Sequence, residues 1–166
     1  MLQLPEGLRG TVEDDLHVTL AYLGQADPAE ALLAFEAAVE RLQGPIEARA
    51  SGWALLGPAR RPWAVALELA GEGLVGALSG LRDPCRALVG LEPESRPVRP
   101  HLTLGAIPRS ASEAFRREVA EWVDQASVPR LSIPISSVAL YTHASEGRAR
   151  YAVVQSRGMA QMSRGR

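Results

Sequence analysis

The 166-residue chain is 46% hydrophobic, which suits one domain with a sizeable core and is too little for two ordinary domains. Its formal net charge of −1 argues against duplex DNA as a partner and favours a small or single-stranded phosphate ligand. The one cysteine, Cys85, cannot form an internal disulfide. We find no leader segment and no apolar run of bilayer length, so we expect a cytoplasmic monomer with no membrane contact.

The first half of the chain opens with a strand and a helix. Residues 16–23 alternate between apolar and polar side chains, which is typical of a strand. Asp27, Pro28 and Glu30 then predict a helix start, as N-cap, first helical residue and capping-box partner. A Gly-Pro pair at 44–45 ends the helix. The expected apolar stripe consists of Leu32, Phe35, Val39 and Leu42.

Two strands and a broken helix are expected next. The runs 46–56 and 63–69 are strand-like and are separated by a Gly- and Pro-rich turn. A helical piece over 74–81 is expected to break near Pro84 and to resume towards residue 88. A loop rich in Pro, Glu and Arg over 90–100 then leads to the second half.

The second half repeats this order of elements. A capping-box pattern at 110–113 predicts a helix start, and an apolar stripe at helical spacing follows it. The strands are expected over 101–107, 131–141 and 150–154, with a turn over 143–147. Because equivalent elements recur at a nearly constant displacement, we interpret the chain as an internal duplication.

The duplication predicts an α+β fold. We expect two pseudo-symmetric lobes, each an antiparallel sheet backed by helices, around a central cleft. The single bilobal domain would cover residues 1–155, and the polar stretch 156–166 is expected to be a disordered tail.

Two copies of His-x-Thr-Leu, which begin at His17 and His101, carry the chemistry. Successive side chains of a strand alternate faces, so each copy presents an imidazole and a hydroxyl on one face and packs its other face into a core. Two imidazoles can hold opposite protonation states near neutrality, and cleavage of a phosphodiester needs such a base and acid. The hydroxyls of Thr19 and Thr103 would stabilise the phosphate oxygens. No metal is expected, because the His and Cys residues lack metal-ligand spacing.

Other residues are weaker candidates for substrate contacts. Arg148, Arg150 and Tyr151 follow the late turn, where an arginine could clamp a phosphate or could equally be a solvated charge at a sheet edge. Tyr22 could stack on a base, although aromatic residues in strands more often belong to the core.

The same two readings, a base-stacking platform or a core residue, apply to Trp53, Trp63 and Tyr141. His143 is expected in the turn at the mouth of the cleft.

The chain resembles the two-histidine (2H) phosphoesterase superfamily and, within it, the bacterial RNA 2',3'-cyclic phosphodiesterases, also called 2'-5' RNA ligases. Residues 16–24 are similar to that family's first motif, 100–105 to its second, and 140–151 to its late strand-turn-strand. The family normally has a full strand before the first motif, and only 16 residues precede His17 here. We therefore expect a remnant of that strand at 2–4, or a true start upstream of the present one.

This resemblance implies metal-independent hydrolysis, without a cofactor, of an RNA end or nucleoside 2',3'-cyclic phosphate to a 2'-phosphate. By position, His101 would activate water, His17 would protonate the leaving 3' oxygen, and the two threonines would hold the phosphate. Which histidine is the acid stays open. So do two alternatives, 2'-5' RNA ligation and a non-catalytic module that binds nucleotides or RNA ends. The chain has no lysine, which excludes a ligase that adenylates its own lysine.

Overall fold

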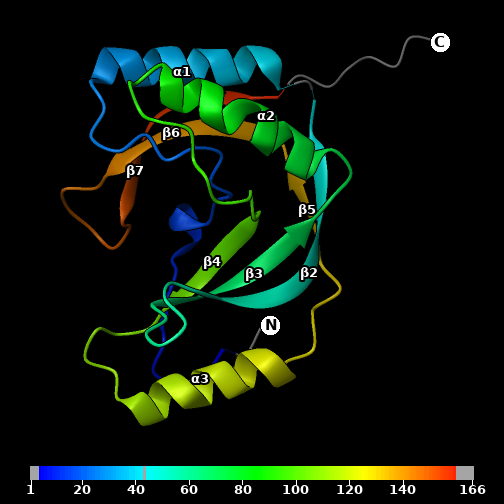
Figure 1. The fold of residues 1–166 in the computed structure, drawn as a ribbon, viewed down its shortest axis with the longest axis vertical. Coiled ribbons are helices and arrows are strands. Elements are labelled where there is room, and N and C mark those ends of the chain that lie inside the picture. Colours follow the sequence, from blue (N-terminus) through cyan, green and yellow to red (C-terminus); the bar gives the residue numbers. More distant parts are fainter. Residues whose placement is uncertain (1–3, 43, 160–166) are drawn as a thin grey trace.

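The computed structural model describes residues 4–42 and 44–159, which form an α+β fold (Figure 1). One antiparallel sheet has the strand order β1-β4-β3-β2-β5, and β6 pairs with β7 in a second sheet. The helices are α1 (Pro28–Arg41), α2 (Leu74–Ala87) and α3 (Glu113–Gln125), with a 3₁₀ turn at Glu13–Asp15. The strands are β1 (Arg9–Gly10), β2 (Ile46–Leu56), β3 (Ala64–Ala70), β4 (His101–Ala106), β5 (Ser132–Ile135), β6 (Ser137–His143) and β7 (Tyr151–Gly158).

The helices lie on opposite sides of the two sheets. In Figure 1, α1 and α2 lie together at the top, where α1 contacts β6, and α3 lies at the bottom, where it contacts β2. The β2–β3 hairpin of the first half pairs with β4, which begins the second half. The two sheets therefore do not correspond to the two halves of the sequence.

Side-chain caps begin α1 and α3. The Asp27 carboxylate accepts a hydrogen bond from the Ala29 N–H at 2.8 Å, as predicted. In α3 the cap is Ser112, whose hydroxyl accepts from the Phe115 N–H at 3.1 Å, so the helix begins two residues later than a cap at Ser110 would place it. The stripe predicted for α1 is partly wrong, because its buried residues are Ala34, Phe35 and Ala38, whereas Leu32 is exposed.

Helix α2 is continuous through Pro84, and the predicted break is wrong. A proline removes one helical hydrogen bond and disfavours the turn before it. Here Leu81 and Cys85, on either side of Pro84, are both buried. Tertiary packing of this face therefore holds the helix through the proline.

The strand predicted over 131–141 is two strands in different sheets. β5 pairs with β2, and β6 pairs with β7, with the break at Ser136, whose carbonyl accepts from the Met159 N–H at 2.7 Å. Pro134 cannot donate to a second neighbour, which suits β5 to its place at the edge of the five-stranded sheet.

The chain ends differ from the expectations. The remnant strand expected at 2–4 falls largely outside the described residues, and the first observed strand is β1, which pairs with β4 through Arg9 and Gly10. β7 continues to Gly158, so the tail predicted from Ser156 begins inside a strand. The part of that tail over 160–166 lies outside the described residues.

The core between the sheets and helices anchors both motifs. A buried cluster is formed by Ala48, Leu67, Leu69, Leu74 and Leu78. Val18 and Leu20 of the first motif and Leu102 and Leu104 of the second pack against this cluster. The alternation predicted a core contact for each motif, and the structure adds that the two motifs share one core. Among the described residues, no helix is both long and apolar enough to cross a membrane.

Candidate active site

The two histidines are held by the same local contact. His17 Nδ1 lies 2.7 Å from the Asp15 carbonyl oxygen, and His101 Nδ1 lies 2.7 Å from the Arg99 carbonyl oxygen. A carbonyl oxygen can only accept, so Nδ1 carries the hydrogen in both rings. This fixes the neutral tautomer and leaves Nε2 of each ring as the atom that can take up or give a proton.

The second motif lies in the interior strand β4. In the ladder to β3, His101 is opposite Glu68 and Thr103 is opposite Ala66. The Glu68 carboxylate accepts from Arg99 Nε at 2.5 Å, so an ion pair lies beside the imidazole. A Cβ at Gly52, the partner of Glu68 on β2, would lie 2.9 Å from Glu68 Oε2. The glycine therefore leaves room for this carboxylate.

The first motif lies outside any strand, and the strand predicted over 16–23 is wrong. Its support is Asp15, which is buried and ends the 3₁₀ turn. The Asp15 carboxylate accepts from the backbone N–H of Arg150 at 2.7 and 3.0 Å and from that of Tyr151 at 3.0 Å. One side chain thus takes the place of a strand ladder and attaches the motif to the start of β7.

Sequence reasoning missed this role of Asp15. The available signal was an acidic residue directly before the apolar-polar alternation, two positions ahead of His17. This local signal does not identify the hydrogen-bond partners of Asp15, because the two N–H groups belong to residues 135 and 136 positions further along the chain.

Aromatic rings surround His17. The rings of Tyr141 and Tyr151 each lie 5.3 Å from the His17 ring, centroid to centroid, and Tyr151 meets it edge-on. His143 stacks on Tyr151 at 5.6 Å. Tyr151, a predicted contact residue, and Tyr141 thus both lie at the first motif, and His143 continues the cluster at the end of β6.

The remaining predicted residues are less closely tied to the histidines. Thr19 is exposed and Thr103 is half-buried. Arg148 and Arg150 are exposed between β6 and β7, where Arg150 meets Asp15 through its backbone N–H. The Tyr22 ring is 68% exposed, and within the described residues it forms no aromatic contact with either histidine.

Helix α2 holds the loop that leads to His101. The Arg82 guanidinium donates to the carbonyl oxygens of Arg96 at 2.7 Å and Glu94 at 2.8 Å. The Asp83 carboxylate accepts from the Glu94 N–H at 3.1 Å. Arg96 hydrogen-bonds the Glu94 carboxylate and lowers the pKa of that group to about 2. These contacts order the loop before the second motif, and sequence reasoning had not assigned them.

Cys85 is buried and does not lie where its thiol could attack a substrate. Burial raises the pKa of its thiol, and Sγ donates to the Ala34 carbonyl oxygen at 3.5 Å. Among residues 4–42 and 44–159, no three His, Cys, Asp or Glu side chains come together as metal ligands.

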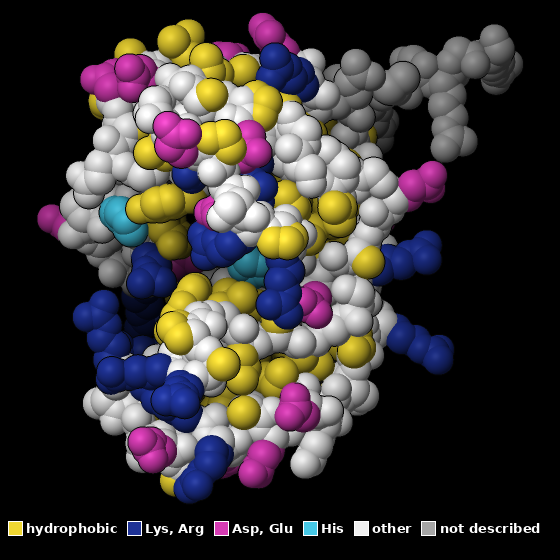
Figure 2. Space-filling view, in the orientation of Figure 1, with side chains coloured by type: hydrophobic (Ala, Val, Ile, Leu, Met, Phe, Trp, Pro, Cys, Tyr) yellow, Lys and Arg dark blue, Asp and Glu magenta, His cyan; other side chains and the backbone are white. Residues whose placement is uncertain are grey.

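Figure 2 shows a hollow between the part of the molecule that carries α1 and α2 and the part that carries α3. Histidine and arginine side chains lie along it, and arginines gather at its left-hand mouth. The formal net charge of the chain is −1, but the arginines make this hollow locally positive, which suits an anionic ligand.

Solved structures of similar fold were found over nearly the whole chain. A structure of Escherichia coli LigT complexed with 3'-AMP covers 95% of this chain and 84% of its own, with 22% identity and a TM-score of 0.66. The protein TT0787 of Thermus thermophilus covers 94% and 84%, with 20% identity and a TM-score of 0.68. A protein described as a phosphoesterase covers 95% and 84%, with 23% identity and a TM-score of 0.64. A sequence search of curated proteins finds no match.

The family model of the 2'-5' RNA ligase superfamily, a superfamily of two-histidine phosphoesterases, matches most of the chain, and the solved structures share its fold. The chain belongs to the 2'-5' RNA ligase superfamily, whose family model matches residues 11–147. Its activity is therefore that of a phosphoesterase or a ligase-like enzyme.

Proposed function

We propose that this chain hydrolyses the 2',3'-cyclic phosphate of an RNA end or a nucleoside to a 2'-phosphate, without a metal ion. The observation that carries the proposal is the matching pair of Nδ1–H to carbonyl hydrogen bonds, both 2.7 Å long, at His17 and His101. Two imidazoles with free Nε2 atoms supply the base and the acid of an in-line displacement.

The reaction needs two proton transfers on opposite sides of the phosphorus. In our assignment His101 Nε2 takes a proton from water, whose oxygen attacks the phosphorus. His17, protonated at Nε2, gives its proton to the 3' oxygen as the P–O3' bond breaks, and the product keeps a 2'-phosphate. The Thr19 and Thr103 hydroxyls would donate to the non-bridging oxygens, where negative charge increases in the transition state.

The nucleotide class of the substrate is proposed from related structures. E. coli LigT has been solved with 3'-AMP, with ATP and with NADP⁺. The locally positive hollow of this chain suits such ligands, and the exposed Arg148 and Arg150 are candidates for the phosphate contact.

The test is an incubation in EDTA with the four nucleoside 2',3'-cyclic monophosphates and with a short RNA that ends in a cyclic phosphate. Chromatography that separates 2'- from 3'-phosphates identifies the product. We expect a 2'-phosphate, lost in His17→Ala and in His101→Ala. A 3'-phosphate product, or activity that requires a metal, would contradict the scheme.

Ligation is the second candidate, because the superfamily takes its name from 2'-5' RNA ligases. With a 5' hydroxyl in place of water, the same histidine pair could form a P–O5' bond at a cyclic phosphate end as the P–O3' bond breaks, which leaves a 2'-5' linkage. Adding an RNA with a 5' hydroxyl to the same incubation tests it, since a longer RNA would appear. Binding without any product would instead favour a non-catalytic module.

A further inference from the structure

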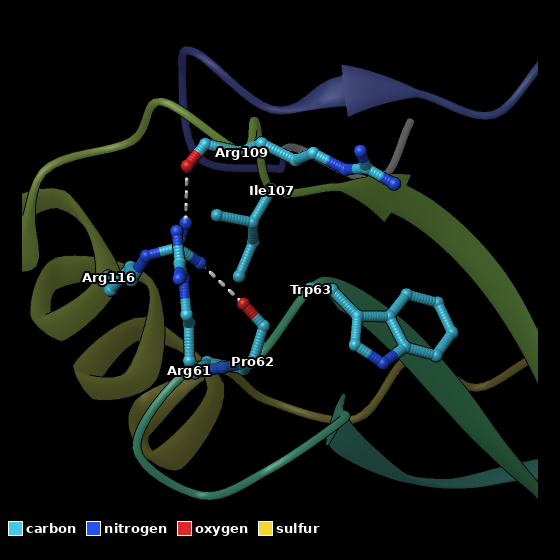
Figure 3. Close-up of a pocket in the computed structure, with 6 residues that line it drawn as sticks. All are labelled: Arg61, Pro62, Trp63, Ile107, Arg109 and Arg116. Atoms are coloured by element: carbon cyan, nitrogen blue, oxygen red, sulfur yellow. Dashed lines mark hydrogen bonds between the residues drawn. The ribbon is translucent and has the colours of Figure 1, made fainter.

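A pocket outside the candidate active site lies beside the last residues of β4, at the opposite end of this strand from His101. It is lined by residues of the β2–β3 turn, of the segment after β4 and of α3 (Figure 3), and it has a volume of about 260 Å³. We call it the arginine–tryptophan pocket, and its lining residues are Arg61, Pro62, Trp63, Ile107, Arg109 and Arg116.

Arg116 connects the two segments that form the walls of this pocket. Its guanidinium donates to the carbonyl oxygens of Pro62 at 2.6 Å, Pro108 at 3.1 Å and Arg109 at 3.3 Å. One side chain of α3 thereby ties the β2–β3 turn to the segment after β4, as the dashed lines in Figure 3 show. The Ile107 N–H also donates to the Trp63 carbonyl oxygen at 2.9 Å. The two walls are therefore fixed before any ligand binds.

The Trp63 indole forms a platform at this site. A Cβ at Gly57 would lie 2.2 Å from Trp63 Cδ1, so the ring rests directly on the glycine backbone. Gly57 has φ of +107°, which other residues rarely adopt, so the turn itself keeps this place free of a side chain. The Trp63 residue nevertheless remains 49% exposed. A rigid aromatic ring with an open side is what nucleobase stacking requires.

The pocket is lined by three arginines that form no ion pair with a carboxylate of the described residues. None of the three ion pairs in the described part of the chain involves Arg61, Arg109 or Arg116. Arg61 and Arg109 are exposed, and Arg109 extends past Ile107 to the side on which the Trp63 ring lies (Figure 3). Two exposed arginines that form no ion pair in the described part of the chain, in a pocket that an indole also lines, suit a ligand with both phosphates and bases.

Strand β4 connects this pocket to the candidate active site. His101 is its first residue, and Ile107 follows its last, so the two lie about 20 Å apart at the usual rise per strand residue. A single nucleotide bound at His101 does not extend that far, whereas an RNA chain does.

We propose that the arginine–tryptophan pocket binds the single-stranded RNA segment upstream of the end that reacts, with phosphates on Arg61 and Arg109 and a base on Trp63. This inference rests on the proposed function for the identity of the reacting end. It adds a reason for the enzyme to prefer an RNA substrate over a cyclic mononucleotide.

The test separates binding from turnover. A fluorescent single-stranded RNA of about ten nucleotides that ends in a 2'-phosphate is titrated with the protein at several salt concentrations. We expect Trp63→Leu to raise the Kd about tenfold, within the range for one stacked base. We expect the double variant Arg61→Ala/Arg109→Ala to lower the slope of log K against log salt by about 1.4, since each single-strand phosphate contact contributes about 0.7.

Controls keep the pocket apart from the fold and from the catalytic centre. Arg130→Ala removes an exposed arginine that lies outside the pocket and should leave the Kd unchanged. Arg61→Lys/Arg109→Lys should restore the salt slope. Turnover of a cyclic mononucleotide should be unchanged in Trp63→Leu and in the double alanine variant, while kcat/KM for a cyclic-ended RNA falls about tenfold.

Unchanged RNA binding in Trp63→Leu and in the double alanine variant would overturn the proposal, as would an RNA affinity below detection in the unaltered protein. An equal loss with mononucleotide and RNA would also overturn it. If the protein binds RNA through the pocket but turns over no substrate, the proposed hydrolysis fails and the RNA site stands.

Discussion

The two copies of the motif have the same ring geometry and different supports. His101 begins β4, which pairs with β3 at His101 and with β1 only at Gly105 and Ala106, whereas His17 lies in a segment outside any strand. Both rings nevertheless donate from Nδ1 to the carbonyl two residues earlier at 2.7 Å.

The comparison teaches that the orientation of the ring is a local property, and that its position in the molecule is not. The contact between residues i and i−2 needs only the motif and the two residues before it. The position depends on a backbone ladder in the second copy and on the Asp15 carboxylate in the first. The first copy should therefore be the more fragile of the two.

The largest expected effect comes from removing either ring. His17→Ala and His101→Ala should each lower kcat/KM for a 2',3'-cyclic nucleotide by about 10²- to 10⁴-fold, the range for losing a general acid or base. The double variant should be little worse than the worse single variant, because the two rings act as a unit. Near-normal turnover in either single variant would break the equivalence of the two copies.

The threonines come next. Thr19→Ala and Thr103→Ala should each lower kcat about 10²-fold, the scale for losing one donor to a developing oxyanion. Thr→Ser keeps the hydroxyl and serves as the matched control, which should retain most of the activity. If Thr→Ser and Thr→Ala lose the same activity at one site, that threonine acts through packing and does not donate to the phosphate.

Asp15→Ala tests the support of the first copy alone. It removes the acceptor of the Arg150 and Tyr151 N–H groups, so we expect the free energy of unfolding to fall by about 1 to 3 kcal/mol. We also expect kcat/KM to fall about tenfold, because His17 loses its fixed position. Urea unfolding and steady-state kinetics measure the two effects. Asp14→Ala, an exposed neighbour in the same 3₁₀ turn, is the control and should change neither.

The smallest effect is expected from Arg99→Ala in the second copy. Arg99 is exposed and its partner Glu68 is half-buried, and ion pairs at the surface contribute about 0 to 1 kcal/mol. The backbone ladder should keep His101 in place, so kcat/KM should change no more than about fivefold. A loss larger than that of Asp15→Ala would reverse the predicted order of fragility.

The sequence predicted the elements whose signals are local. The bounds of β2 agree at both ends with the expected strand 46–56, because a Gly-Pro stop lies on each side. Asp27 correctly predicted the start of α1 through its cap. The α+β class followed from the order and repetition of the elements, and the packing of each motif into a core followed from the alternation.

Features that depend on distant partners could not be predicted in this way. The break between β5 and β6 at Ser136 depends on which strand each segment pairs with. The continuity of α2 through Pro84 depends on what Leu81 and Cys85 pack against. At the candidate site, the repeated pattern singled out both histidines, and their catalytic roles stay a prediction. The Asp15 anchor and the Tyr141 ring beside His17 come from chain pairings that no local pattern contains.

The most direct test of the account is the pH dependence of kcat/KM for a nucleoside 2',3'-cyclic phosphate in EDTA. A base and an acid that are both imidazoles predict a bell-shaped profile across the neutral pH range, because one ring must be neutral and the other protonated. The product should be a 2'-phosphate throughout. A rate that is flat across this range, or that rises with pH without a second limb, would contradict the paired-histidine mechanism.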